Sequence, residues 1–354
     1  MYKRKYRLAA AAFLLLLVMV LSACGASNDA QKAEGSENAA AVTEKESASA
    51  NEGADKAKTE AEPAAKEEAS DGEMRTYASV KGDIKIPAHP QRIVTDYYAG
   101  ELLTVGANVV GAEPSVKDNP FFEGLLNDTE DVGYPTNLEK AITLKPDLIV
   151  VMYDDQYDAL SKIAPTVYIP YGTASTVEDN VKLFGDLTGR AAEADAFLAD
   201  FEKIAEEGRA KLAGVVDENA TFGLYEITDK GELWTFGENS GRAGQAIYNA
   251  LQLKMPEKIK TDVADKDGFL QLSMEVLPDY AADYMFVTSY DPEKKGDKLK
   301  ELQNSAVWKN LPAVKANRVF VNDFDKFYRY DPISIKGQVT EIVDMLTKNA
   351  EESK

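Results

Sequence analysis

The sequence predicts an α/β protein made of two lobes that are joined by one long, rigid helix. Short runs rich in β-branched and aromatic residues alternate with helical patterns between residues 92 and 171. The same alternation returns between residues 221 and 323, and a stretch with helical periodicity, residues 175–214, separates the two regions. Alternating strands and helices are typical of a parallel sheet with helices on its faces.

The first lobe contains four predicted strands, "RIVTDYY" (92–98), "NVVGA" (108–112), "DLIVVMY" (147–153) and "TVYIPY" (166–171). Between the first two, Leu102, Leu103 and Val105 share a helical face, and Gly106 is a stop signal. A further helix is predicted over 137–146, where Pro146 ends it. We place this lobe at residues 75–177.

The second lobe, residues 214–354, repeats the pattern. Its predicted strands cover 221–227, 232–237, 284–290 and 318–323, and its predicted helices cover 244–253 and 273–280. The connecting region, 178–213, contains a helix predicted at about 191–212, which would span roughly 30 Å at 1.5 Å per residue. A coiled coil is an alternative, but the apolar repeat is brief for one.

The amino terminus is typical of an exported protein. "MYKRKYR" is basic and precedes an apolar run of about 15 residues, the usual length of a secretory signal and short for a membrane span. Cys24, the one cysteine in the chain, follows in "LSAC", which resembles the lipobox of bacterial lipoproteins. That resemblance implies a signal peptide at residues 1–23 and a lipid on Cys24. A retained anchor helix is the alternative.

Residues 24–74 are rich in Ala, Glu, Lys and Ser and contain no aromatic residue. Such a segment cannot bury enough apolar surface to offset chain entropy, so we interpret it as a disordered acidic tether. The whole chain has a formal net charge of −20 and a sequence pI of about 4.6. This charge argues against nucleic acid as a partner and against adsorption on anionic lipid.

Several segments resemble, in order, the ferric siderophore-binding lipoproteins of ABC importers, and most closely the hydroxamate (ferrichrome-type) binders. They include "GDIKIPAHPQRIVTDYYAGELLTVGANVVGA", "VGYPTNLEKAITLKPDLIVV", "FGENSGRAGQAIYNALQLKMPEKI" and "SAVWKNLPAVKANRVFV". The resemblance implies two Rossmann-like lobes with the ligand cleft between them. It also implies a monomeric receptor, lipid-anchored on the extracytoplasmic face of the cell membrane, that delivers its ligand to an ABC permease. No cofactor or direct metal ligand is implied, because the ligand is a ferric siderophore.

A siderophore already wraps its iron, so the protein needs aromatic walls and a few polar or cationic groups. In α/β lobes these groups gather at the carboxyl ends of strands. The aromatic candidates there are Tyr97, Tyr98, Tyr153, Trp234, Phe236, Tyr290, Phe324, Phe327, Tyr328 and Tyr330. Each of them alone also fits core or loop packing.

Arg242 is the main cationic candidate, because it lies in a glycine-rich turn before a predicted helix. Its guanidinium could bond to chelate oxygens, and the resemblance implies contact with a hydroxamate core. A helix cap or an ion pair with Glu238 is the alternative. The family often carries an aromatic residue two positions earlier, where this chain has Ser240. Hydroxamates are favoured over catecholates because one arginine with many aromatic residues suits a nearly neutral chelate.

Glu139 and Glu275 occupy equivalent places in the two lobes, each at the predicted start of a helix. The helix dipole alone could explain an acid there. The resemblance implies instead that they dock onto permease arginines.

Other classes of function find less support. A divalent-metal receptor would need a His-rich site, and the chain has only His89. A haem- or cobalamin-binding receptor of the same transporter class stays open. The sequence has no HExxH, GxSxG or P-loop motif. Carboxylate pairs are common in so acidic a chain, so a surface-anchored hydrolase is a further alternative.

Overall fold

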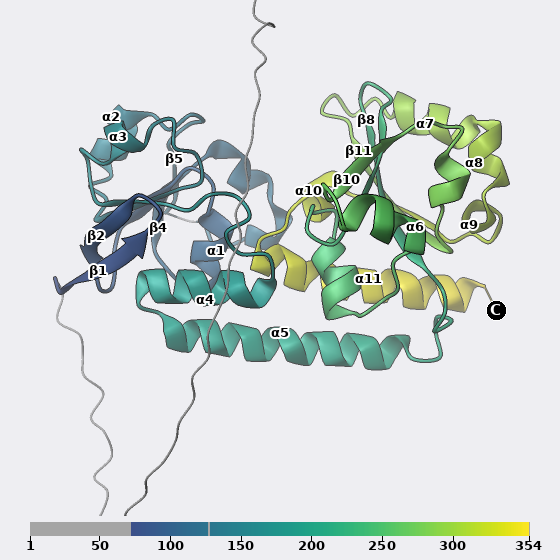
Figure 1. Cartoon of the computed structure of the whole chain (residues 1–354), viewed down its shortest axis with the longest axis horizontal. Coiled ribbons are helices and arrows are strands. Elements are labelled where there is room, and N and C mark those ends of the chain that lie inside the picture. Colours follow the sequence, from purple (N-terminus) through teal and green to yellow (C-terminus); the bar gives the residue numbers. More distant parts are fainter. Residues whose placement is uncertain (1–71, 127, 354) are drawn as a thin grey trace, which may run out of the picture. The chain divides into compact units, whose positions relative to one another are not determined.

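The computed structural model describes residues 72–126 and 128–353 (Figure 1). The predictions for the signal peptide, for Cys24 and for nearly all of the tether lie outside the described residues. Within the described ranges, no helix combines the length and apolarity that crossing a membrane requires.

The amino-terminal lobe is built on a five-stranded parallel sheet in the order β5-β4-β3-β6-β7. The residues of β3, β4 and β6 are all buried, as expected for a parallel sheet covered on both faces. An antiparallel hairpin, β1 and β2, precedes the sheet. The strands are β1 (Met74–Ser79), β2 (Gly82–Pro87), β3 (Ile93–Thr95), β4 (Val109–Ala112), β5 (Glu130–Asp131), β6 (Leu148–Val151) and β7 (Thr166–Tyr168). The helices are α1 (Ala99–Thr104), η1 (Pro114–Asp118), η2 (Pro120–Phe122), α2 (Leu138–Thr143), α3 (Tyr157–Leu160) and α4 (Val177–Thr188).

The carboxyl-terminal lobe has a mixed sheet in the order β10-β9-β8-β11-β12, in which β8, β11 and β12 are parallel and β9 and β10 are antiparallel to their neighbours. The strands are β8 (Phe222–Thr228), β9 (Leu233–Phe236), β10 (Phe269–Leu272), β11 (Tyr284–Tyr290) and β12 (Val319–Asn322). The helices are η3 (Gln245–Ala250), α6 (Glu257–Ile259), η4 (Lys260–Ala264), η5 (Leu277–Tyr280), α7 (Asp297–Asn304), α8 (Ala306–Asn310), α9 (Pro312–Lys315) and α10 (Phe324–Phe327).

Two predicted helices of this lobe differ from the sequence-based expectation. The segment predicted as a helix over 244–253 is a π-helix, η3, entered through a turn with positive φ at Arg242 (53°) and Ala243 (69°). The segment predicted over 273–280 is helical only in its last four residues, the 3-10 helix η5, which has Pro278 in its first turn. Glu275 therefore lies in the turn before η5 and not in a helix, which corrects its predicted position.

The predicted connecting helix is present as α5 (Ala191–Leu212). It begins just after α4, which ends at Gly189 in the left-handed conformation. A second long helix, α11 (Pro332–Glu352), packs along α5, and the sequence analysis did not predict it (Figure 1). Gly208 of α5 allows a close approach to both α11 and the end of η3, because a Cβ atom there would lie 3.1 Å from Val343 Cγ2 of α11 and 2.8 Å from Cδ2 of Leu251, which follows η3.

The start of α11 packs against the amino-terminal lobe. Asp331 caps the helix by accepting a hydrogen bond from the Ser334 backbone N–H at 2.9 Å. Asn119 of the amino-terminal lobe donates to Ser334 Oγ at 2.8 Å. At Gly337 a Cβ atom would lie only 2.2 Å from the Phe121 ring. One cluster of buried apolar residues includes Ile93 and Leu102 of the first lobe and Phe222 and Phe286 of the second, so the lobes share a core.

Glu101 of α1 is buried at this junction, with 3% of its surface exposed. Burial, reinforced by the nearby Asp331, raises the pKa of Glu101 to about 8. The carboxyl group is therefore neutral in the folded protein at pH 7 and ionised in the unfolded chain.

Replacing Glu101 by Gln should remove a pH dependence of stability. In the wild type, the Glu101 carboxyl group keeps its proton in the folded state up to about pH 8. In the unfolded chain the same group loses its proton above a pKa of about 4.3. The free energy of unfolding therefore falls as pH rises toward 8. The loss between pH 5 and pH 8 is on the order of 3 kcal/mol. Urea unfolding at both pH values should show a smaller loss for Glu101→Gln, while the exposed control Glu257→Gln behaves like the wild type. An equal loss in Glu101→Gln would contradict the burial argument.

Candidate functional site

Five tyrosines form a continuous wall at the carboxyl ends of the amino-terminal strands and across to the other lobe. Their ring centroids are 5.8 Å apart for Tyr134 and Tyr153, 6.3 Å for Tyr153 and Tyr97, 6.1 Å for Tyr97 and Tyr330, and 5.9 Å for Tyr330 and Tyr171. The hydroxyl groups of Tyr97 and Tyr330 also share a hydrogen bond. Tyr330 belongs to the segment before α11, so this wall connects the two lobes.

Asp96 fixes one part of this wall. It directly follows β3 and accepts hydrogen bonds from the backbone N–H groups of Met152 (2.8 Å) and Tyr153 (3.2 Å), which follow β6. Burial raises the pKa of Asp96 to about 6, although the two backbone hydrogen bonds oppose the rise. Asp96 therefore holds the backbone of Tyr153 at the edge of the sheet.

The facing wall in the carboxyl-terminal lobe centres on Arg242. Its guanidinium lies over the Phe236 ring at 4.3 Å and the Tyr328 ring at 4.9 Å. Such stacking is a cation–π arrangement. Phe324 stacks on Tyr328 at 4.8 Å and contacts Tyr290 at 4.9 Å, which extends the aromatic surface.

Arg242 pairs with Glu226 and not with Glu238, the partner that the sequence suggested as the alternative to a ligand. Nε and one terminal nitrogen lie 2.9 and 2.8 Å from Glu226 Oε2, and the other terminal nitrogen lies 3.1 Å from the Ser240 carbonyl oxygen. A guanidinium has five N–H groups, so donors remain for a ligand. Burial raises the pKa of Tyr171, and the positive charge of Arg242 opposes this rise. Arg242 and Tyr171 therefore interact electrostatically across the cleft.

The backbone around Arg242 is unusual. Both Arg242 and Ala243 have positive φ, a conformation that costs non-glycine residues free energy and that occurs often at binding sites. The preceding Gly241 also has positive φ, and a Cβ atom there would lie 2.7 Å from the Tyr328 carbonyl oxygen. The turn is thus pressed against the segment that carries Tyr328, which fixes the arginine between its two rings.

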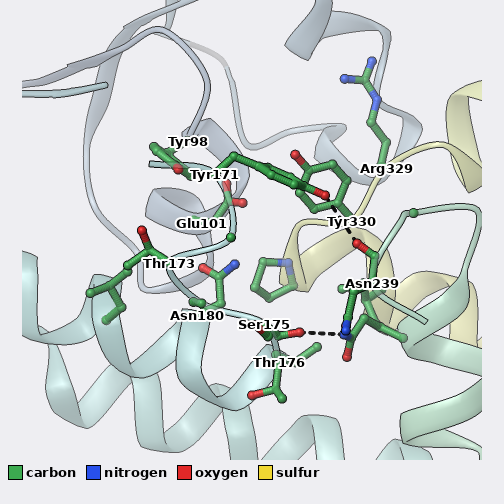
Figure 2. Close-up of a pocket in the computed structure, with 18 of the residues that line it drawn as sticks. Tyr98, Glu101, Tyr171, Thr173, Ser175, Thr176, Asn180, Asn239, Arg329 and Tyr330 are labelled. Carbon is green, nitrogen blue, oxygen red and sulfur yellow. Dashed lines mark hydrogen bonds between the residues drawn. The ribbon is translucent and has the colours of Figure 1, made fainter. Parts of the chain in front are cut away.

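A cavity of about 130 Å³ lies between the lobes beside Tyr171 and Tyr330 (Figure 2). Tyr171 reaches across it, and its hydroxyl donates a hydrogen bond to the Asn239 carbonyl oxygen at 3.4 Å. The cavity is bounded by α1, by the start of α4, by the turn at 239–245 and by the start of α11. Tyr330 thus belongs to the aromatic wall and also lines the cavity.

The structure brings together most of the predicted ligand-binding residues, but not all. Tyr97, Tyr153, Arg242, Phe236, Tyr328 and Tyr330 lie in the two walls, and Tyr290 joins them through Phe324. Tyr98 is buried, lines the cavity and donates to the Ile169 carbonyl oxygen at 2.7 Å. Trp234 is partly exposed beside Phe269, at 6.0 Å. Phe327 is fully buried in the core because it lies on the inner face of the short α10, so its assignment to the ligand site is corrected.

Three residues of the site were not identified from the sequence patterns used above: Tyr134, Tyr171 and Glu226. Tyr171 ends the fourth predicted strand, and the rule that found Tyr153 also applies to it. Glu226 lies inside β8, where an acid among apolar residues could have indicated a buried ion pair.

Glu139 and Glu275 are both exposed. Glu139 lies in the first turn of α2 as predicted, whereas Glu275 precedes η5. Within residues 72–126 and 128–353, no group of three or more His, Cys, Asp or Glu side chains could hold a metal ion.

The chain is similar to known solute receptors. It is 60% identical over 282 residues to the iron(3+)-hydroxamate-binding protein YxeB of Bacillus subtilis, which covers 80% of this chain and 88% of that protein. It is 35% identical over 347 residues to the iron(3+)-hydroxamate-binding protein FhuD of the same organism, covering 97% and 98%.

Solved structures of binding proteins have a similar fold. One is the FhuD-fold periplasmic binding protein component of a ferrichrome ABC transporter from Bacillus subtilis, with a TM-score of 0.70, 36% identity, and coverage of 77% of this chain and all of that one. Another is FhuD2 of Staphylococcus aureus with bound ferrioxamine B, with a TM-score of 0.66, 27% identity, and coverage of 74% and 100%. The family model "Periplasmic binding protein" matches residues 98–325. The chain belongs to the periplasmic binding protein family.

Proposed function

We propose that this protein is the extracytoplasmic receptor of an ABC importer and that it captures a ferric hydroxamate siderophore for iron uptake. The observation that carries the proposal is Arg242, held between two aromatic rings and facing the tyrosine wall of the other lobe. The similarity to two iron(3+)-hydroxamate-binding proteins supports the same ligand class.

The chemistry of the walls suits such a chelate. The siderophore itself occupies the coordination sites of the iron, so the protein contributes no metal ligand. Aromatic rings contact the organic shell, and the free N–H groups of Arg242 bond to hydroxamate oxygens as charge-assisted donors. One arginine, already paired with Glu226, adds little net charge. This balance suits a nearly neutral chelate better than a tris-catecholate anion.

The proposal includes no catalytic step and no cofactor. The relatives named above are binding proteins, and the aromatic walls offer contact surface without a nucleophile–base pair. Haem and cobalamin are the competing ligands of the same transporter class, and a binding assay separates them from a hydroxamate.

We further propose that the receptor is a monomer held at the membrane by a lipid on Cys24, and that it docks onto the permease through Glu139 and Glu275. The two carboxylates are exposed, and each lobe contributes one of them. A permease with two similar halves could recognise such a pair through basic residues.

A fluorescence titration tests the ligand. The unit Lys66–Lys354 contains both lobes and two tryptophans, of which Trp308 is buried and Trp234 is partly exposed. Ferric hydroxamates should quench Trp234 with one-to-one saturation, and Trp234→Phe should abolish the change. Arg242→Gln should weaken binding about ten- to a hundred-fold, since hydrogen bonds to charged groups contribute about 1.5–3 kcal/mol.

The matched control is Arg318→Gln, because Arg318 also stacks on a ring, that of Tyr284, but Tyr284 is the first residue of β11 and belongs to neither aromatic wall. It should bind like the wild type. Quenching only by haem or cobalamin would replace the proposed ligand. No response to any chelate, combined with turnover of a glycoside, would favour the hydrolase alternative.

Uptake of radioactive iron by cells tests docking. The double variant Glu139→Ala, Glu275→Ala should lose most uptake while the isolated protein keeps its affinity for the chelate, because neither residue belongs to the aromatic walls. Glu207→Ala, an exposed acid on α5, serves as the control. Normal uptake by the double variant would contradict the docking proposal.

A further inference from the structure

The cavity between the lobes holds buried oxygen atoms that lack donors. The Oδ1 atom of Asn180 and the Oε1 atom of Gln338 have no hydrogen-bond partner within the described part of the chain. Gln338 is fully buried, and its Nε2 donates to the carbonyl oxygens of Lys326 and Arg329, both at 2.8 Å. Its remaining oxygen is therefore an acceptor that needs a donor. A buried acceptor without a partner costs roughly 1–3 kcal/mol, so such atoms indicate a missing ligand or water.

The charges around the cavity are unbalanced. Glu101 lines it and forms no ion pair among residues 72–126 and 128–353. Asp331 lies close to Glu101 and is buried, and Arg329 is the basic side chain among the lining residues. Two acids therefore face one base. Asp331 accepts two hydrogen bonds from Ser334, and the positive charge of the nearby Arg329 favours its ionised form. Glu101 is therefore the acid of this pair that lacks a cationic partner among the described residues.

Figure 2 shows that Glu101 and Asn180 both point into the cavity, from α1 and α4. Apolar side chains complete the lining, among them Leu183, Phe184, Pro332 and Ile335. The volume of about 130 Å³ holds a short alkyl chain or several water molecules.

We propose that this cavity binds a primary alkylammonium group, with the Glu101 carboxylate, Asn180 Oδ1 and Gln338 Oε1 as acceptors. An ammonium group has three N–H donors and no acceptor, and three side chains of the cavity offer oxygen acceptors. The apolar lining covers the alkyl stem. A hard metal ion fits less well, because such ions require several carboxylate or carbonyl oxygens. Among residues 72–126 and 128–353, no three His, Cys, Asp or Glu side chains are grouped so that they could hold a metal ion.

Two sources could supply this group: the amine-bearing tail of a chelate or a free alkylamine. The first rests on the proposed function. Tyr330 belongs both to the aromatic wall and to the cavity lining, so a chelate on the wall could extend a tail past Tyr330 or Tyr171 toward Glu101.

Binding of an ammonium group beside Glu101 should release a proton from the protein. Because the pKa of Glu101 is about 8, the carboxyl group carries a proton at pH 7, and an ammonium group beside it favours the carboxylate. Up to one proton is therefore released on binding at pH 7, and affinity rises between pH 6 and pH 9. The other titratable groups that face Glu101 or the cavity are Asp331, Arg329, Glu113 and the tyrosines 97, 98, 171, 328 and 330. Burial raises the pKa of tyrosines 97, 98, 171 and 330, so they stay protonated in this range.

Titration calorimetry on the unit Lys66–Lys354 tests the proposal with three probes: ferrioxamine B, which has a free primary amine, its N-acetyl derivative, and pentylamine. The amine-bearing chelate should bind at least ten-fold more tightly than the acetylated one. Its binding at pH 7 should release protons, measured by comparing buffers of different ionisation enthalpy. Glu101→Gln should abolish both the preference and the proton release, while Glu257→Gln keeps them. Urea unfolding confirms that each variant is folded.

Equal affinities for the two chelates without proton release, combined with no binding of pentylamine, would overturn the proposal and leave the proposed function intact. Binding of pentylamine with proton release but of neither chelate would support the cavity site and overturn the proposed function. If Glu101→Gln is unfolded, the Asn180→Leu variant provides the same comparison, and an unchanged preference in it would count against the site.

Discussion

The structure depends on the contact between the start of α11 and the amino-terminal lobe. Asp331 caps the helix, Asn119 bonds to Ser334, and Gly337 lets the Phe121 ring approach the helix backbone. The rest of α11 packs on α5 and on the carboxyl-terminal lobe. Two long helices and a shared core therefore hold the lobes in one arrangement. Packed cores shift between discrete states rather than deforming continuously, so this junction resists gradual closure.

A fixed arrangement gives the cleft a shape before any ligand arrives. Tyr330 precedes α11 directly and bonds to Tyr97 of the other lobe, so the junction also aligns the two aromatic walls. Arg242 is held by Glu226, by two rings and by a backbone turn with positive φ. Preorganised groups lose little conformational entropy on binding, which favours affinity. The same junction buries Glu101, whose neutral state at pH 7 reflects the cost of a charge there.

The fold class could be predicted from sequence patterns, because the apolar repeat of a strand differs from that of a helix and segments of the two kinds alternate in both lobes. The bounds of α5 could be predicted from its apolar spacing, whereas α11 was not predicted, although Asp331 and Pro332 form a helix-start signal. Strand ends identified Tyr97 and Tyr153, since the carboxyl ends of parallel strands meet at one edge. Arg242 was identified from the glycine-rich turn before a predicted helix. The pairing of Arg242 with Glu226 could not be predicted, because it depends on how a turn folds back over β8. Phe327 and Tyr328 are adjacent in sequence, and only the packing of α10 decides which of them is buried.

Small-angle X-ray scattering of the unit Lys66–Lys354, with and without a saturating ferric hydroxamate, would show whether the lobes form a preorganised cleft held by α5 and α11. If the cleft is preorganised, the radius of gyration and the pair-distance distribution should stay unchanged within experimental error when the ligand binds. A marked compaction on binding would contradict a preorganised cleft, because the lobes would then rotate about the junction that the structure places between them.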